Sequence, residues 1–264
     1  MAIKNKVIWI TGASSGIGKA LAIELSKLDT RLILSSRNEV TLNEVKKICK
    51  NPENIAILPL DLEKYEDFDK TALKAISFFG SIDILINNGG VSQRALAIDT
   101  SLTVDKRIMD INYMGTIALS KAILPHFIAQ KSGHFVVVTS VTGKVSTPVR
   151  SAYAASKHAL HGFFDSLRSE VYKYNIDVTL ILPGYIKTQL SYNALIGDGS
   201  KQNKMDPATN NGLLPEVFAK KMIRAIEKKK REVTIGGLKE VASVYLKRFF
   251  PGLLAKLVRK VNVT

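Results

Sequence analysis

Short apolar runs alternate with longer helical patterns along most of this 264-residue chain, and that alternation constrains the fold more than any other feature. The runs are near-continuous in Val, Ile and Leu, which is typical of strands buried on both faces. They cover residues 7–11, 32–36, 55–60, 82–87, 135–140 and 178–182.

Helical patterns fill the intervals between these runs. In the first, apolar residues recur every three or four positions, as one face of a helix requires: Ile17, Leu21, Leu25 and Leu28. The next patterns cover residues 39–50, 66–79, 104–130 and 151–174, and a helix (215–229), a strand (232–235) and a helical tail (238–260) follow.

Strict alternation of strand and helix predicts a parallel sheet with right-handed crossovers. We expect a doubly wound, Rossmann-like α/β fold of about seven strands, with helices on both faces of the sheet and a helical tail at the C-terminal end. No linker or repeat interrupts the pattern, so residues 1–264 are predicted to form a single domain.

Residues 189–214 lack clear periodicity and are rich in Asn, Gly, Asp and Ser. A loop of this length inside a compact domain is usually functional or disordered. We expect it to be a substrate loop, because loops carry specificity in folds whose scaffold serves many chemistries. Its candidate apolar wall residues are Leu190, Tyr192, Leu195, Ile196 and Met205.

One cysteine cannot form an internal disulfide, and no Cys/His cluster has the spacing of a metal site. The first residues lead directly into the first apolar run, without the longer apolar region and cleavage site of a signal peptide. No run approaches the roughly 18 apolar residues that a membrane span requires. We therefore expect a cytoplasmic protein without a metal ion.

The formal net charge of +15 is the unusual feature of the composition. Residues 216–264 hold thirteen Lys or Arg and four Glu, which gives +9 of that total. In the predicted tail, 238–260, Leu, Phe and Val are mixed with Lys and Arg. This pattern suits a basic amphipathic helix on an anionic membrane, and it suits equally a helix that packs its apolar side on the domain or on a partner subunit.

A nucleic-acid partner is disfavoured, because it predicts a basic face interleaved with exposed aromatic side chains. The single tryptophan, Trp9, lies inside the first predicted strand and cannot take that role.

A glycine-rich turn, Thr-Gly-Ala-Ser-Ser-Gly-Ile-Gly at residues 11–18, joins the first strand to the first helix. Gly12 permits the tight turn, Gly16 lets the backbone approach a pyrophosphate, and Gly18 lets the helix pack close to the strand. Backbone amides at the helix start then face the phosphates. The turn predicts a dinucleotide site formed by Gly12, Ser14, Ser15, Gly16, Ile17 and Gly18.

Ser36 and Arg37 follow the second strand, where an NAD enzyme normally has an acidic residue that accepts hydrogen bonds from the adenosine ribose. A carboxylate would repel a 2′-phosphate, whereas a guanidinium pairs with it. We therefore expect NADP(H) as the preferred cofactor, with NAD(H) as the alternative.

The spacing Gly-x-x-x-Gly-x-Gly with a preceding Thr resembles the short-chain dehydrogenase/reductase family. In that family an aspartate after the third strand meets the adenine amino group, and this chain has Asp61 and Leu62 there. Asn88, Gly89 and Gly90 belong to an Asn-Asn-Gly-Gly segment where the family usually has Asn-Asn-Ala-Gly.

A further segment after the sixth strand, Pro-Gly-Tyr-Ile-Lys-Thr, matches the family segment that holds the nicotinamide carboxamide. The resemblance implies that Pro183, Gly184, Ile186 and Thr188 bind the cofactor, with Ile186 acting through its backbone and Thr188 through its hydroxyl.

Tyr153 and Lys157 place a phenol and an ammonium four residues apart on one helix face. A tyrosine titrates near ~10 in isolation, and a neighbouring cation lowers that pKa by favouring the phenolate. Ser140 ends the fifth predicted strand, at the edge where doubly wound sheets bind ligands. With Asn112 in the helix 104–130, these residues are similar in order and spacing to the family's catalytic tetrad.

The resemblance implies hydride transfer with acid–base catalysis. Tyr153 would donate a proton to the carbonyl oxygen, and Ser140 would hydrogen-bond the same oxygen. Lys157 would bind the nicotinamide ribose and lower the pKa of Tyr153, so that both side chains contact cofactor as well as act in catalysis. Asn112 would position a water that returns the proton from solvent.

Longer stretches resemble one subgroup of the family, the dehydrogenase/reductase SDR family members 7 and 7B. They include residues 88–94, 151–159 and 183–186, and the similarity continues to 251–254. Many members of that subgroup carry an N-terminal membrane anchor, which we do not expect here. The subgroup includes reductases proposed for lipid, steroid or retinoid-like carbonyls, so the resemblance implies an apolar carbonyl or alcohol substrate.

The family usually forms a dimer through its fourth and fifth helices, so the resemblance also implies a homodimer or homotetramer. The leading hypothesis is an NADP-dependent ketone or aldehyde reductase. A non-catalytic NADP-binding sensor or scaffold is an alternative, but it would be expected to lack Tyr153 or Lys157. An NAD-dependent alcohol dehydrogenase running in the oxidative direction is another.

Overall fold

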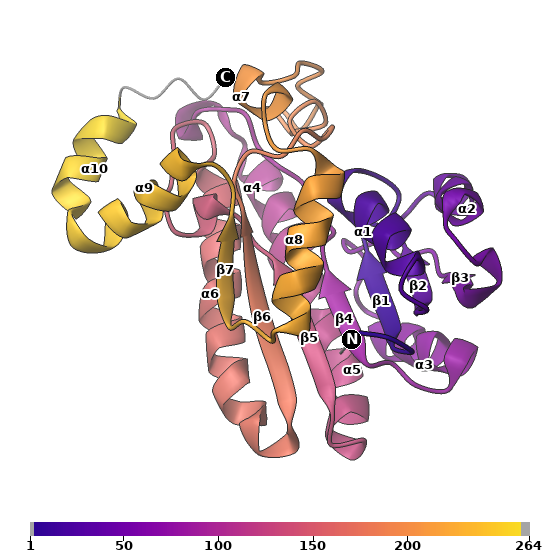
Figure 1. The fold of residues 1–264 in the computed structure, drawn as a ribbon. Coiled ribbons are helices and arrows are strands. Elements are labelled where there is room, and N and C mark those ends of the chain that lie inside the picture. Colours follow the sequence, from indigo (N-terminus) through magenta and orange to yellow (C-terminus); the bar gives the residue numbers. More distant parts are fainter. Residues whose placement is uncertain (1–2, 260–264) are drawn as a thin grey trace.

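A seven-stranded parallel sheet forms the centre of the computed structural model, which describes residues 3–259 (Figure 1). The strand order is β3-β2-β1-β4-β5-β6-β7, so the order reverses between β1 and β4. In doubly wound sheets the ligand crevice lies at this reversal, outside the carboxyl ends of the strands. The strands are β1 (Val7–Thr11), β2 (Arg31–Ser35), β3 (Ile55–Ile57), β4 (Ile84–Asn87), β5 (Gly133–Val138), β6 (Ile176–Pro183) and β7 (Glu232–Ile235). The predicted doubly wound fold is confirmed.

Helices cover both faces of the sheet, as the alternation predicts. Buried residues of α1, α2 and α8 pack on one face, and those of α3, α5 and α6 pack on the other. The helices are α1 (Gly16–Ser26), α2 (Glu39–Ile48), α3 (Phe68–Phe79), α4 (Leu102–Met109), α5 (Gly115–Ala129), α6 (Ser151–Val171), α7 (Pro207–Asn210), α8 (Pro215–Glu227), α9 (Leu238–Phe249) and α10 (Pro251–Val258).

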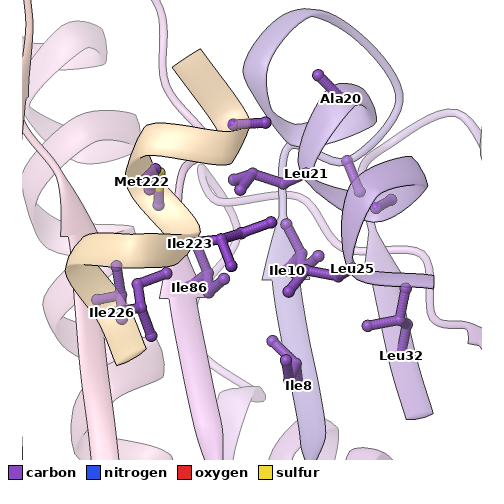
Figure 2. Packing of buried hydrophobic residues seen from close by; sticks show 14 of the residues in the cluster. Ile8, Ile10, Ala20, Leu21, Leu25, Leu32, Ile86, Met222, Ile223 and Ile226 are labelled. Atoms are coloured by element: carbon purple, nitrogen blue, oxygen red, sulfur yellow. The ribbon is translucent and has the colours of Figure 1, made fainter. Parts of the chain in front are cut away.

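Strand β1 shows why these runs are apolar throughout: its successive side chains enter two different cores. Ile8 and Ile10 belong to the core under α1 and α8, where Leu21 and Ile223 meet them (Figure 2). Trp9 belongs to the opposite core and is fully buried, so the prediction that it lies inside the first strand is confirmed. Every position of the strand is therefore buried, as suits its interior place between β2 and β4.

The predicted helix 104–130 is interrupted by one π-helical turn, Asp110–Met114, between α4 and α5. Such turns insert a residue into a helix and are frequent at functional sites. Close packing accompanies this one: a Cβ on Gly115 would lie 2.1 Å from the carbonyl oxygen of Leu62. The π turn therefore lies directly before the point where the helix packs against the segment that follows β3.

The prediction of one amphipathic helix over 238–260 is wrong. Two helices, α9 and α10, meet at Phe250, whose backbone (φ −135°, ψ 59°) is not helical. Pro251 explains the break, because proline disfavours the α conformation in the residue before it. Lys260 lies outside the described residues. Between residues 3 and 259, no helix has both the length and the apolar character needed to cross a bilayer.

The loop 189–214 contains more regular structure than its composition predicts. Helix α7 lies within it, and single β-bridges join Leu195 to Gln93 and to Lys201, and Leu213 to Ile186. The loop is thus attached to the segment after β4 and to the segment after β6, both at the ligand edge of the sheet.

Helix α1 comes closest to the turn after β1 at Gly18, so a substitution at this position tests the packing directly. A Cβ at this position would lie 2.2 Å from the Gly12 carbonyl oxygen and 2.7 Å from the Asn88 side-chain nitrogen. We expect Gly18→Ala to lower the free energy of unfolding by about 1–3 kcal/mol, because helix and strand must separate. Urea denaturation measures the change.

Gly162 in α6 provides the matched control, because a Cβ there meets nothing within 4 Å. Gly162→Ala should raise the free energy of unfolding by about 0.5–1 kcal/mol through helix propensity. Equal effects of the two substitutions would contradict the packing argument.

Candidate active site

A large cavity opens at the carboxyl ends of the parallel strands, with a volume of about 1660 Å³. It extends from the glycine turn after β1, past the ends of β4 and β5, to α10. Ligand pockets for drug-sized molecules usually measure about 300–1,000 Å³. The cavity therefore has room for a dinucleotide and a second molecule.

Most of the predicted site residues line this one cavity, although they come from distant parts of the chain. They are Gly12, Ser14, Ser15, Gly16, Ile17, Ser36, Arg37, Asp61, Leu62, Asn88, Gly89, Gly90, Ser140, Tyr153, Lys157, Pro183, Gly184, Ile186 and Thr188. Gly18 and Asn112 do not line it: Gly18 faces the β1 turn and Asn112 is buried behind the wall.

The glycine turn is held against the end of β4 by two side chains. The Thr11 hydroxyl oxygen accepts hydrogen bonds from the backbone N–H groups of Asn88 and Gly89, each at 3.0 Å. The Asn88 amide donates to the carbonyl oxygens of Thr11 (3.0 Å) and Gly12 (3.2 Å). These bonds fix the turn where the strand order reverses.

Three observations show that this turn fits a pyrophosphate. Gly12 and Gly16 have φ of +64° and +51°, which side chains rarely permit. Helix α1 begins at the cavity, and its first turn contains no acidic residue that would repel an anion. Thr188 stands opposite, because a Cβ on Gly16 would lie 3.1 Å from its methyl group.

At the end of β2 the cavity wall is cationic. Arg37 is exposed and lines the cavity beside Ser36. The next residue, Asn38, caps α2 by accepting a hydrogen bond from the Thr41 backbone N–H at 3.2 Å. Arg37 therefore lies at the edge of the cavity, as the sequence predicts. Ser36 and Arg37 stand where an NAD enzyme normally has an acidic residue.

Gln93 holds the start of α6, which carries Tyr153. Its side-chain oxygen accepts hydrogen bonds from the backbone N–H groups of Ala152 (2.8 Å) and Tyr153 (3.3 Å). The side chain is fully buried and satisfies two amides that a helix start leaves without partners. Sequence reasoning gave Gln93 no role, although it lies within a stretch that resembles the family.

Burial raises the pKa of the Tyr153 phenol, which corrects the prediction that a neighbouring cation lowers it. A hydrogen bond with Ser140 and the charges of Arg150 and Arg94 act in the opposite direction without reversing the shift. Ser140 lies two residues past the end of β5, and its hydroxyl is 2.6 Å from that of Thr142. The phenol is therefore held in its protonated form in the protein without ligands.

Lys157 is also buried, and desolvation lowers the pKa of its ammonium group to about 8. The ammonium donates a hydrogen bond to the Val138 carbonyl oxygen at 3.0 Å and lies 5.8 Å from the centre of the Tyr153 ring. Gly90 approaches it closely, since a Cβ there would be 3.6 Å from the ammonium nitrogen.

Asn112 lies in the π turn and uses its whole side-chain amide on protein groups. Its oxygen accepts from the Val91 N–H at 2.8 Å, and its nitrogen donates to the Val91 carbonyl (2.9 Å) and to the Ser156 hydroxyl (3.0 Å). These contacts join the segment after β4 to α6. They give the side chain a role in positioning these two segments. The family resemblance implies a different role, in which Asn112 positions a water.

A buried ionic cluster beside Tyr153 was missed by sequence reasoning. Arg94 donates to the Asp206 carboxylate from Nε at 2.8 Å, and Arg150 lies 3.5 Å from the same oxygen. Burial, and then the charge of Arg150, lower the pKa of Arg94. The cluster joins the loop 189–214 to the cavity wall. Because its members are up to 112 residues apart in sequence, no local pattern could reveal it.

The outer part of the cavity is mainly apolar, but only part of the predicted wall is correct. Leu190 and Leu195 line it, whereas Tyr192, Ile196 and Met205 do not. The additional apolar residues are Val145, Leu213, Leu214, Val217, Leu254, Leu257 and Val258. Across residues 3–259, no group of three or more His, Cys, Asp or Glu side chains is arranged to hold a metal ion.

Comparison with known proteins identifies the family of this fold and site. The family model described as short chain dehydrogenase matches residues 6–196. This chain belongs to the short-chain dehydrogenase/reductase family. It is therefore an oxidoreductase of that family, and the resemblance to members 7 and 7B is confirmed by dehydrogenase/reductase SDR family member 7B of Xenopus tropicalis. That protein is 43% identical over 256 residues, which cover 94% of this chain and 83% of its own length.

Two solved structures of the family share the fold. A short-chain dehydrogenase/reductase of Burkholderia phymatum in complex with NAD has a TM-score of 0.83 and 21% identity, and covers 100% of this chain and 98% of its own. A short chain dehydrogenase of Burkholderia cenocepacia in complex with NADP has a TM-score of 0.80 and 24% identity, with coverages of 97% and 99%.

We expect the burial of the Lys157 ammonium group to lower the free energy of unfolding of this short-chain dehydrogenase/reductase. The difference between the ordinary pKa of 10.5 and about 8 corresponds to about 3 kcal/mol. Lys157→Met keeps the shape but removes the charge and the bond to Val138. We expect it to raise the free energy of unfolding at pH 7 by about 1–3 kcal/mol.

The stability gained by Lys157→Met should be largest below pH about 8 and should decrease as the pH rises. Below pH about 8 the folded wild type carries a buried charge, so the penalty is complete. Between about 8 and 10.5 the unfolded chain binds more protons than the folded one, so the stability of the wild type rises with pH. Chemical denaturation at pH 7 and pH 10 measures the difference, and a variant less stable than the wild type at pH 7 would contradict the desolvation argument.

Proposed function

We propose that this chain is an NADP-dependent reductase that transfers a hydride between nicotinamide and an apolar ketone or aldehyde. One observation carries the proposal: Ser140, Tyr153 and Lys157 line the same cavity as the glycine turn and Arg37. The candidate site for a phosphorylated dinucleotide and the proton donor therefore face one shared cavity.

The cofactor, when bound, supplies or accepts the hydride. Tyr153 donates a proton to the carbonyl oxygen of the substrate, and Ser140 hydrogen-bonds the same oxygen as negative charge develops on it. Lys157 binds the nicotinamide ribose hydroxyls. Asn112 keeps the segment after β4 against α6, and Gln93 fixes the first turn of that helix.

The environment of the phenol suits the acid role that reduction requires. Burial raises the pKa of Tyr153, so the side chain is protonated at neutral pH and can donate its proton. Oxidation of an alcohol would use the same side chain as the base.

The preference for NADP rests on the end of β2. Arg37 and Ser36 line the cavity in the position where a carboxylate would select NAD. The solved relatives bind NAD in one case and NADP in the other, so they support a nicotinamide cofactor without choosing between the two.

The apolar substrate is proposed from the outer cavity. Val145, Leu195, Leu213 and Leu214 line the same cavity as the reacting groups and contribute hydrocarbon surface to it. A homodimer or homotetramer, a cytoplasmic location and a peripheral membrane contact through 238–260 stay predictions.

Tyr153→Phe tests the mechanism. The substitution removes only the hydroxyl, so NADPH-dependent reduction of apolar ketones and aldehydes should fall by a factor of about 10² or more. NADPH binding, measured by fluorescence titration, should change less than about threefold. Retained turnover would reject Tyr153 as proton donor. NADPH binding without turnover of any carbonyl by the wild type would favour a nucleotide sensor or scaffold.

Arg37→Asp tests the cofactor preference. The carboxylate would repel a 2′-phosphate and accept hydrogen bonds from ribose hydroxyls, so the ratio of kcat/KM for NADPH to that for NADH should fall by about 10². Lys47→Asp on α2 makes the same charge change at an exposed position outside the cavity and should leave the ratio unchanged. An unaltered ratio in the Arg37 variant would make Arg37 an incidental surface charge.

A further inference from the structure

Helix α9 presents an apolar face to solvent, in addition to Val241, Val244 and Leu246, which are half-buried. Leu238, Ala242, Tyr245 and Phe249 follow one another at spacings of four, three and four residues, so they share one side of the helix. Leu238, Tyr245 and Phe249 are 90%, 64% and 67% exposed, and no residue of α9 is buried. Packing within residues 3–259 therefore does not account for Leu238, Tyr245 and Phe249.

Helix α10 continues the same kind of surface. Phe250, Leu253 and Leu257 lie at spacings of three and four residues and are all exposed, whereas Leu254 faces inward and is buried. Figure 1 shows α9 and α10 projecting together beyond the β7 side of the sheet. We call the exposed apolar residues of the two helices, 238, 242, 245, 249, 250, 253 and 257, the tail face.

The two helices that form the tail face carry an excess of cations. Between residues 238 and 259 the chain has Lys239, Lys247, Arg248, Lys256 and Arg259, and Glu240 is the single acid. A two-fold contact would bring together two copies of the same cationic surface, each with Glu240 as its one acid. An anionic lipid surface instead satisfies both properties, because its interface accepts apolar side chains and its headgroups attract Lys and Arg.

The same two helices form part of the cavity wall. Leu254, Leu257 and Val258 of α10 line the cavity, as do Lys239 and Ser243 of α9. Leu257 belongs both to the tail face and to this wall. A surface bound to the tail face is therefore next to the outer, apolar end of the cavity.

We propose that the tail face binds an anionic membrane surface and holds the mouth of the cavity against the lipid, so that an apolar substrate enters from the bilayer. Interfacial helices insert their apolar face about 5–10 Å into the headgroup region. The delivery of substrate rests on the proposed reductase function, whereas the binding of membrane does not.

Co-sedimentation of the full chain with vesicles tests the binding. The protein should pellet with phosphatidylcholine vesicles that contain phosphatidylserine, and much less with pure phosphatidylcholine. Arg248→Glu/Lys256→Glu, at exposed positions that flank the tail face, should weaken binding by at least about fivefold for each charge. Tyr245→Ser/Phe249→Ser should reduce it by about tenfold or more, because two exposed aromatic side chains no longer enter the interface.

Matched controls come from exposed positions on α2, just after α2, and on α3. Lys47→Glu/Lys50→Glu makes the same charge change, and Ile48→Ser/Leu73→Ser removes comparably exposed apolar side chains. Both controls should bind vesicles like the wild type. No lipid-dependent pelleting, or equal loss in the controls, would overturn the proposal. A wild-type dimer that becomes a monomer in Tyr245→Ser/Phe249→Ser, without vesicle binding, would show that the face joins two copies.

Turnover tests the delivery of substrate. With a long-chain ketone dissolved in the mixed vesicles, Tyr245→Ser/Phe249→Ser should raise the apparent KM several-fold, whereas a water-soluble ketone should be reduced as by the wild type. Equal KM values for the vesicle-borne ketone would overturn the delivery step. If no carbonyl is reduced but the protein still binds vesicles, the reductase function is rejected and the proposed membrane binding is supported.

Discussion

The close approach of α1 to the end of β1 is the contact on which the rest of the site depends. Gly18 lies so near the Gly12 carbonyl that no side chain fits between them, and Thr11 and Asn88 tie the same turn to the end of β4. The start of α1 is thereby fixed at the point where the strand order reverses. Every other part of the cavity is placed relative to that point: Arg37 after β2, Ser140 after β5 and Thr188 after β6.

The site places two ionisable groups where burial opposes their charged forms. Desolvation lowers the pKa of Lys157 to about 8 and raises that of Tyr153. Neither shift favours folding, because each reflects a charged form that the protein solvates poorly. The same burial gives a proton donor that stays protonated and a cation that a bound ribose can readily satisfy. The stability given up here is compensated by the two apolar cores on either side of the sheet.

Much of the fold was predictable because a strand buried on both faces must be apolar at every position, as β1 is. The cavity-lining glycines and the Tyr153–Lys157 pair were equally readable, since each is a short local pattern. Three features were not. The π turn at Asn112 accompanies contacts with Val91, Ser156 and Leu62 that only the folded chain makes, and the Arg94–Asp206 pair is likewise formed only by folding. Burial decides the direction in which the pKa of Tyr153 shifts. The sequence shows the lysine four residues away but does not show that burial. The break before Pro251 was local and could have been foreseen.

The short segment 92–94 contacts the substrate loop through its backbone and the catalytic helix through a side chain. Leu195 exchanges backbone hydrogen bonds with Ser92 and Arg94, while Gln93 between them caps the helix that carries Tyr153. The loop predicted to meet the substrate and the helix that carries the proton donor are thus anchored on the same three residues. A substitution in 92–94 that moves the backbone would therefore disturb both walls of the cavity at once.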